Sequence, residues 1–315
     1  MTMEDPNQFW DGEKWTGPIT DAHMHLDRKG RFLDAALDFQ NSGGTRLILV
    51  HKPNFSQLPV SVDEVSAAYE ETLLIAEEVR KSTNIDIQVI LGPHPVVWAH
   101  QLESLGEKTA TELHFESIDL ALSHFEMGQC VGIGEIGRPH FPVSSEVWDS
   151  ANQMLEEVLR RCANHNAPVQ FHVEDRGAIT CQELSEICAR ANFPLSLALR
   201  HYAPADVSSN FTSNLPVTVS MGRGSVEKIA KTIDFESVLE GTHSPVLMET
   251  DYLDDPRRPG AVLGPRTVPK RTNELGRHLQ RSKEEGGLGW NHQEISNFLW
   301  HIHRVWPDTL YGECR

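Results

Sequence analysis

The chain has few cysteines, and none has the spacing of a metal-binding or redox pair. There are five in 315 residues, an odd number, and no C-x-x-C occurs. This spacing argues against both a zinc ribbon and a disulfide framework. Two of them are seven residues apart, which places them on one face of a helix as small hydrophobic side chains. The cysteines are Cys130, Cys162, Cys181, Cys188 and Cys314.

Long apolar runs are also missing. No run reaches the roughly 18 residues that a membrane-spanning helix needs, and the mean hydropathy is −0.38. The first ten residues, M-T-M-E-D-P-N-Q-F-W, have neither the basic region nor the apolar region of a signal peptide. We therefore expect a cytoplasmic protein that does not associate with membranes.

Positive charge is scarce: 28 basic residues face 45 acidic ones, a formal net charge of −17. Such a field repels polyanions, and the chain has no strip of basic and aromatic residues suited to stacked bases. We therefore expect a small-molecule or short phosphoester substrate, with long nucleic acid disfavoured and the oligomeric state open. Arginine outnumbers lysine, so a salt-rich cytoplasm that screens the acidic surface is a further hypothesis.

The chain does contain an alternation of short apolar runs with longer amphipathic segments. Eight runs have the length and composition of strands, and helical patterns lie between them, for example over 145–163 and 179–190. Eight strand–helix units in about 250 to 300 residues predict an α/β fold, a (β/α)8 TIM barrel. A doubly wound open sheet is the competing architecture. The runs begin at Ile19, Thr45, Ile87, Cys130, Pro168, Leu195, Pro216 and Pro245.

The remaining patterns indicate one domain. Ser61 and Glu64 form the pattern of a capping box at the start of a helix. No linker or low-complexity tract interrupts the chain, so residues 1–315 are expected to form a single domain. Residues 254–271 are rich in proline, glycine and arginine and predict a long loop after the last strand.

Metal-ligating side chains occur where the predicted strands end. D-A-H-M-H places His23 and His25 on one face of a strand, because alternate residues point the same way. In a TIM barrel the C-terminal ends of the strands carry the active site. Each of these side chains alone is compatible with a solvated strand end, but together they are typical ligands of zinc, manganese or a similar ion. The set is His23, His25, His94, Glu135, His172, His201 and Asp251.

Most of the other histidines are expected to have no functional role. His301 and His303 repeat the H-x-H spelling, but residues i and i+2 diverge on a helix, so we do not count them as a site. Five more are expected in loops or on helix surfaces without partners: His51, His100, His114, His124 and His165.

Five motifs in this order resemble the TatD family, which consists of amidohydrolase-type metal-dependent hydrolases with TIM-barrel folds. The motifs are D-A-H-M-H, G-P-H-P, G-E-I-G, P-V-Q-F-H and E-T-D, and the resemblance runs from residue 19 to residue 253. V-W-P-D-T-L-Y-G at 305–312 is similar to the closing element of the family.

The resemblance implies a binuclear centre of two divalent metal ions. Zinc is the first expectation, with manganese, magnesium, nickel and iron as alternatives. The implied ligands are His23, His25 and Asp251 for one ion and His172 and His201 for the other, with Glu135 bridging the two.

The chain departs from the family pattern beside these motifs. G-E-I-G is followed by R-P-H-F where the family has L-D-Y, and H-V-E and H-Y-A replace H-x-R and H-C-F. These positions surround the substrate, so we expect a divergent branch with retained ligands and a different substrate. Arg138 and His140 could contact an anion, or Arg138 could pair with an acid. The resemblance also implies substrate contacts for His94 and Arg266.

The resulting hypothesis is a hydrolase in which a metal-activated water attacks a phosphoester, as in a nuclease or phosphodiesterase. Asp251 would act as the general base, and Glu135 would hold the reacting centre together. Hydrolysis of a small ester, lactone or cyclic amide is the first alternative. A metal-binding barrel without catalysis, used as a scaffold or sensor, is the second.

Overall fold

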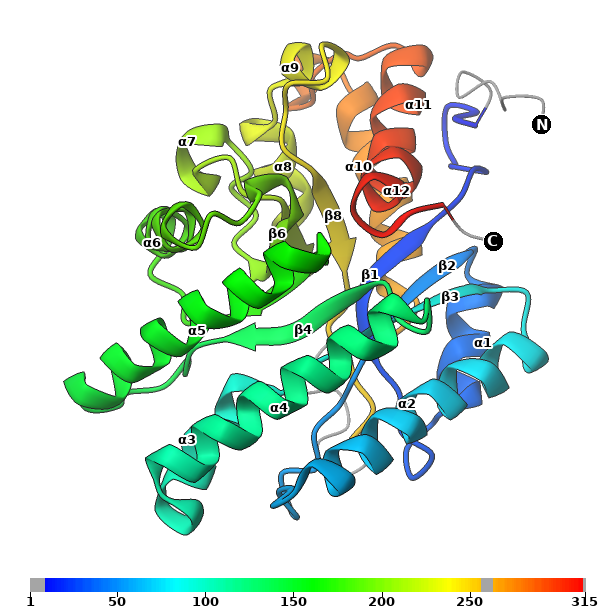
Figure 1. The fold of residues 1–315 in the computed structure, drawn as a ribbon. Helices are drawn as coiled ribbons and strands as arrows, with labels where there is room; N and C mark the ends of the chain where they lie inside the picture. Colours follow the sequence, from blue (N-terminus) through cyan, green and yellow to red (C-terminus); the bar gives the residue numbers. More distant parts are fainter. Residues whose placement is uncertain (1–8, 256–262, 314–315) are drawn as a thin grey trace.

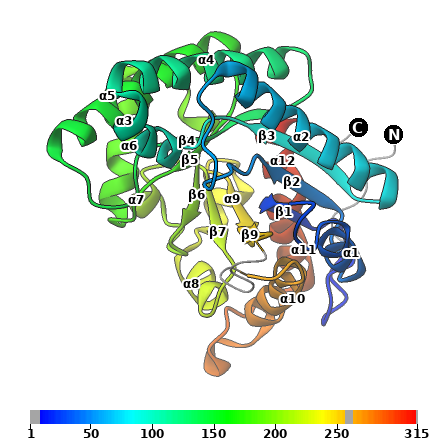
Figure 2. The ribbon, with the colours of Figure 1, turned by 90° about the horizontal axis from the view of Figure 1, so that it is seen from below.

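The computed structural model describes residues 9–255 and 263–313. Cys314, the first eight residues and the middle of the predicted 254–271 loop lie outside the described residues. Strands occupy the centre of the molecule, and helices surround them (Figures 1 and 2). The single-domain interpretation of residues 1–315 stays a prediction.

Nine parallel strands form one sheet in the order β8-β7-β6-β5-β4-β3-β2-β1-β9. Neighbours in the sequence are therefore neighbours in space, as repeated strand–helix units require. All eight apolar runs of the sequence contain a strand. The strands are β1 (Thr20–His25), β2 (Arg46–Val50), β3 (Asp86–Leu91), β4 (Gly132–Gly137), β5 (Val169–His172), β6 (Ala198–Ala203), β7 (Val217–Ser220), β8 (Val246–Glu249) and β9 (Tyr252–Leu253).

The sheet curls until its last strand meets its first. β9 follows β8 after two residues and pairs in parallel with β1. Between β8 and β9, the Asp251 N–H donates to the His23 carbonyl at 3.1 Å. The side chain of Asp21 accepts from the Thr250 N–H at 3.1 Å and from its hydroxyl at 2.7 Å. This seam confirms the barrel prediction over the open sheet.

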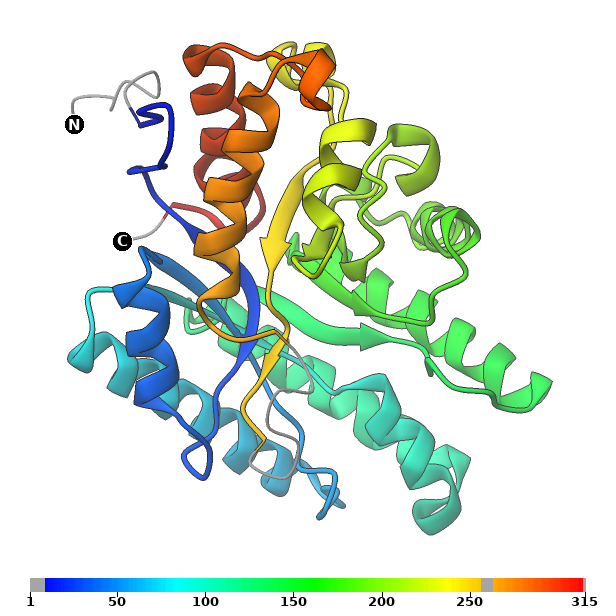
Figure 3. The same cartoon turned by 180° about the vertical axis from the view of Figure 1, so that it is seen from behind.

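Helices follow each strand from β1 to β7, and α10 follows β9. Two helices follow β3, and α10 stands beside α11 (Figure 3). A π-helical turn, His301–Val305, joins the last two helices. The helices are α1 (Leu33–Asn41), α2 (Val62–Ser82), α3 (Pro95–Leu105), α4 (Glu107–Glu126), α5 (Ser145–His165), α6 (Ala178–Arg190), α7 (Ser209–Thr212), α8 (Ser225–Thr232), α9 (Phe235–Leu239), α10 (Thr267–Gln280), α11 (His292–Trp300) and α12 (Trp306–Tyr311).

Strand β2 shows why these runs form a central sheet. Its sequence R-L-I-L-V is buried throughout, as expected for a parallel strand covered on both faces. Arg46, its first residue, is also buried, and its guanidinium donates to a carboxylate oxygen of Asp308 at 2.6 Å. The pair ties α12 to the N-terminal end of the barrel.

Two local predictions need correction. Ser61 accepts from the Glu64 N–H as predicted, but the Glu64 carboxylate accepts from the Val60 N–H instead of completing the box. The predicted 254–271 loop is too long, because α10 begins at Thr267. No helix in the described part of the chain is both long and apolar enough to cross a bilayer.

Candidate metal centre

Six of the side chains that the sequence singles out as ligands meet at the C-terminal ends of the strands. They come from β1, β4, β5 and β6 and from the residue between β8 and β9, and all but two are buried. They fall into two groups that share one glutamate. The six are His23, His25, Glu135, His172, His201 and Asp251.

The first group is built on the H-x-H of β1. The Nε2 atoms of His23 and His25 are 3.1 Å apart, as expected when residues two apart share a strand face. Each lies 3.8 Å from Oδ1 of Asp251. Oε2 of Glu135 is 3.9 Å and 3.6 Å from the same two nitrogens.

Hydrogen bonds on the far side of each ring define its tautomer. Nδ1 of His25 is 2.9 Å from the Val50 carbonyl, which can only accept. Nδ1 of His23 is 2.8 Å from Oε1 of Gln170, whose amide nitrogen donates to the Tyr311 hydroxyl. Both Nδ1 atoms therefore carry the proton, and both Nε2 lone pairs face each other and two carboxylates. This donor set fits a divalent cation.

The second group of side chains contacts the other carboxylate oxygen of Glu135. Oε1 is 2.7 Å from Nδ1 of His172 and 3.2 Å from Nε2 of His201. Nδ1 of His201 is 3.2 Å from Glu249, a fully buried carboxylate that also accepts from the Tyr202 N–H. Nδ1 of His201 therefore donates to Glu249, and its Nε2 faces Glu135. Despite burial, the carboxylates of Glu249 and Glu135 raise the pKa of His201, so a cation bound at Nε2 would replace a proton there. One oxygen of Glu135 thus faces each group, which is the arrangement of a bridging carboxylate.

The pKa values reflect this crowding of charge. Burial raises the pKa of Glu135, but the imidazoles of His94 and His172 outweigh it and hold the pKa well below its usual range. Burial and the nearby His201 lower the pKa of His23, which keeps it neutral as a ligand must be. Burial, partly offset by His201, raises the pKa of Asp251 well above its usual range. A bound cation favours the ionised form of such a carboxyl group.

His94 has the opposite tautomer. It caps α3, and its Nδ1 accepts from the Val96 N–H at 3.1 Å. The proton of the neutral ring is therefore on Nε2, which lies 3.7 Å from Oε2 of Glu135. His94, Glu135 and His172 are close enough to form a third ligand group. A protonated Nε2 instead suits a hydrogen bond to substrate.

Arg138 does not reach the cavity beside the centre. Its guanidinium donates to both carboxylate oxygens of Glu174, at 2.8 and 2.7 Å, and to Glu183 at 2.8 Å. It lies over the Trp148 ring at 4.4 Å, and its side chain is 1% exposed. The structure therefore places Arg138 in the ion pair that was the alternative to an anion contact.

Arg266 also lies away from the ligand groups. Its side chain is 71% exposed and donates to Asp38 of α1 at 2.5 Å. It precedes α10, immediately after the undescribed residues 256–262, and it does not line the cavity. Its predicted substrate contact stays a prediction.

Sequence reasoning missed the residues behind the ligands. Gln170 precedes His172 by two positions and Glu249 precedes Asp251 by two, so the period of the strand could have found both. His140 was expected near an anion, but its Nδ1 lies 2.6 Å from Nε2 of His172. His140 therefore contacts the candidate ligand His172 at the ring nitrogen opposite the one that faces Glu135.

A cavity of about 830 Å³ opens above the two groups. Phe55, Leu58 and Leu253 form an apolar wall, and the lining also includes His94 and four of the candidate ligands, which are His25, Glu135, His172 and Asp251. Lys52 also lines it, with its ammonium group 2.5 Å from Asp27. A cavity of this size suits a small ligand.

The remaining histidines are expected in loops or on helix surfaces without partners, but three of them are buried. His51, His114 and His124 are buried, each less than a tenth exposed. His51 follows β2 directly, and the other two lie on α4. An isolated histidine carries no periodic signal that distinguishes a buried position from an exposed one. The expected lack of partners is also wrong for His51, His124 and His165, which contact Thr72, Gln129 and Glu126.

Comparisons with known proteins agree with this geometry. A family model described as TatD related DNase matches residues 20–286. The chain is 27% identical over 261 residues to an uncharacterized protein of Methanocaldococcus jannaschii, covering 82% of this chain and 87% of that protein.

Two solved structures share the fold. A TatD homologue of Escherichia coli K12 has a TM-score of 0.60 at 18% identity, covering 94% of this chain and 98% of that one. A hydrolase TatD family protein of Entamoeba histolytica has a TM-score of 0.55 at 12% identity, covering 93% and 99%. With most of its length matched by the family model, the chain belongs to the TatD related DNase family and is a metal-dependent hydrolase.

Proposed function

We propose that the protein hydrolyses a phosphoester bond in a small molecule at a centre of two divalent ions, with zinc as the first expectation. The observation that carries the proposal is Glu135, whose two oxygens face two separate groups of imidazoles. In three of those rings, His23, His25 and His201, the Nδ1 atom that points away from Glu135 faces a hydrogen-bond acceptor. The proposed ligands are His23, His25 and Asp251 for one ion, His172 and His201 for the other, and Glu135 for both.

When bound, two divalent ions lower the pKa of an attacking water and polarise the bond to be cut. Asp251 faces both the ligands and the cavity. Its carboxylate accepts the proton of the attacking water and passes it to the leaving group. His94 donates its Nε2 proton to the oxygen on which negative charge develops.

The cavity and the charge support a small substrate. The apolar wall of Phe55, Leu58 and Leu253 can pack against one uncharged group. The net charge of −17 disfavours a long polyanion. A short phosphodiester or phosphomonoester with an apolar substituent fits both observations.

Hydrolysis of a small ester, lactone or cyclic amide is the second candidate. Lys52, the lysine that lines the cavity, is already paired with Asp27. Arg138 is paired with Glu174. An uncharged substrate would not require either cation to be released.

The test is a substrate panel offered to the metal-loaded protein. We expect turnover of bis(p-nitrophenyl) phosphate. Asp251→Asn should lower it by about 10² to 10⁴, and Asp149→Asn, a change at an exposed carboxylate on α5, should leave it intact. Turnover of a γ-lactone or p-nitrophenyl acetate without any phosphoester cleavage would favour the second candidate. Failure with all of these compounds would contradict both.

A further inference from the structure

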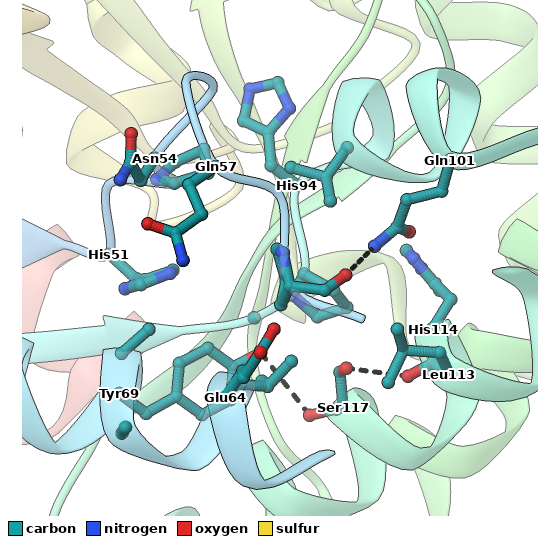
Figure 4. A pocket seen from close by; sticks show the side chains of 18 residues that line it. His51, Asn54, Gln57, Glu64, Tyr69, His94, Gln101, Leu113, His114 and Ser117 are labelled. Carbon is teal, nitrogen blue, oxygen red and sulfur yellow. Dashed lines mark hydrogen bonds between the residues drawn. The ribbon is translucent and has the colours of Figure 1, made fainter. Parts of the chain in front are cut away.

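A second, smaller cavity of about 290 Å³ lies beside the metal centre (Figure 4). We call it the side pocket. It lies beneath the β2–α2 loop, residues 51–61, and is enclosed by helices α2, α3 and α4. Pro53 and His94 line both this pocket and the metal cavity. Its polar lining includes His51, Asn54, Gln57, Gln101, His114 and Ser117.

His114 is the first sign that the side pocket binds a ligand. The residue lies on α4 and is 4% exposed. Among the described residues its ring has no hydrogen bond, ion pair or ring contact. Burial lowers its pKa to about 3, so the ring is neutral, with one donor and one acceptor unused. The ring nitrogens of His114 are not among the fully enclosed polar atoms of the described residues, and the residue lines the pocket, so a ligand there can hydrogen-bond to both.

His51 lies on the opposite side of the pocket (Figure 4). Its Nδ1 is 2.8 Å from the Thr72 hydroxyl, which itself donates to the Ala68 carbonyl at 3.2 Å. The proton of the His51 ring is therefore on Nδ1, and Nε2 is an acceptor. No described residue donates to that Nε2. The amide of Gln57 lies near the space between the two histidines.

The walls of the side pocket select against charge. Val65, Val97 and Leu113 are apolar, and no lysine or arginine is present among the described residues that line the pocket. Its acidic residue, Glu64, is exposed, and its carboxylate accepts from the Val60 N–H. An ion would therefore meet neutral imidazoles and aliphatic carbons, whereas an uncharged polar ring would meet matched donors and acceptors.

We propose that the side pocket binds an uncharged nitrogen heterocycle. The heterocycle donates one hydrogen bond to Nε2 of His51 and makes a second hydrogen bond, as donor or acceptor, with the ring of His114. A cavity of about 290 Å³ lies at the small end of ligand pockets, which suits a molecule of one or two fused rings. Tyr69 supplies an aromatic surface at its inner wall.

Occupancy of the side pocket affects the metal cavity through the β2–α2 loop. Asn54 and Gln57 of this loop face the side pocket, whereas Phe55 and Leu58 face the metal cavity. A ligand that fixes one face of the loop therefore also fixes the other. The consequence is a change in KM for the hydrolysed substrate.

The experiment measures binding of five probes to the metal-loaded protein by saturation-transfer NMR and calorimetry. The probes are cytosine, hypoxanthine, 2-pyridone, benzimidazole and nicotinamide. We expect at least one to bind, and His114→Leu to weaken that binding at least tenfold. The matched control is His243→Leu, which removes a buried imidazole from the loop before β8 and should leave binding unchanged.

A second variant keeps the test independent of the His114 substitution. Ala68→Met extends a side chain into the pocket from α2 without removing a polar group, and it should weaken the same probe at least tenfold. No binding of any probe to the wild type would overturn the proposal. Binding that both variants leave unchanged would place the probe outside the side pocket and overturn it as well. A crystal soaked in the best probe that shows only water in the pocket would do the same.

Discussion

Each histidine at the candidate centre has two ring nitrogens with different partners. In His23, His25 and His201 the Nδ1 atom faces an acceptor, which leaves the Nε2 lone pair for a cation. In His94 the backbone N–H of Val96 occupies Nδ1, which leaves a donor. The same residue type therefore serves as ligand or as hydrogen-bond donor according to its partner.

The first residue-scale prediction concerns Asp251. Asp251→Asn keeps an oxygen ligand but removes the base, so we expect most of the metal to remain and kcat to fall by about 10² to 10⁴. Metal content and turnover are measured on the same sample. Unchanged turnover would contradict the assignment, and equal loss of both would reduce Asp251 to a ligand.

The second residue-scale prediction concerns Glu249. Glu249→Gln replaces one acceptor oxygen with an amide donor, which would face the Tyr202 N–H, the Thr218 hydroxyl or Nδ1 of His201. We expect the affinity for the weaker of the two metal ions to fall by about 10- to 100-fold. A competition titration with a chromophoric chelator measures it, with Glu174→Gln as the matched control. An affinity within twofold of the wild type would show that the Glu249 contact does not position the ligand.

At the scale of elements, the seam between β8 and β1 holds Asp251 in place. Asp251 has a positive φ of 48°, uncommon for a residue other than glycine. Its N–H bonds to the carbonyl of His23, and the preceding Thr250 bonds to Asp21. The same contacts thus close the barrel and position the proposed base.

Thr250→Val tests this seam. The substitution preserves shape but leaves one buried oxygen of Asp21 without its hydroxyl partner, so we expect a loss of about 1–3 kcal/mol in the free energy of unfolding. Urea denaturation measures the loss, and kcat should fall with it. An unchanged midpoint together with unchanged kcat would show that the seam does not depend on this hydrogen bond.

The elements differ in how far the sequence could predict them. The eight principal strands are visible because each is a buried apolar run flanked by helical periodicity. β9 is two residues long, and its pairing with β1 depends on the curl of the whole sheet, which no local pattern encodes. α10 begins inside a segment whose prolines and glycines suggest a loop. The end of a helix in such a segment depends on packing against α8 and α11.

The candidate site follows the same division. Ligand types and their strand-end positions were readable, because histidine and carboxylate spacing is local. The tautomers of His23, His25 and His201 could not be predicted, because their hydrogen-bond partners Gln170, Val50 and Glu249 come from other strands. The sequence does not decide between an anion contact and an ion pair for Arg138, because its contact with Glu174 depends on the approach of β4 to β5.

At the scale of the whole molecule, buried histidines make stability depend on pH. His303 accepts from the Thr20 N–H at 3.2 Å through Nδ1, and burial lowers its pKa from 6.5 to about 3. A lowered pKa contributes stability that is present above pH 6.5 and is lost as the pH falls towards 3. The loss at pH 5.5 is about 1.4 kcal/mol for one such histidine.

The corresponding experiment compares urea denaturation at pH 7.5 and pH 5.5. His303→Gln should lower the free energy of unfolding at both values but reduce its change with pH by about 1.4 kcal/mol. His100→Gln, at an exposed position, is the control. A pH dependence identical to that of the wild type would show that His303 is not held neutral by the fold.

The most direct test of the account is elemental analysis of protein purified without chelator or histidine tag. We predict two divalent ions per chain in the wild type and about one or fewer in Glu135→Ala, because that carboxylate serves both groups. Glu174→Ala should retain two. No bound metal in the wild type, even after reloading with Zn²⁺ or Mn²⁺, would contradict the metal centre. A count that Glu135→Ala leaves unchanged would contradict the bridge.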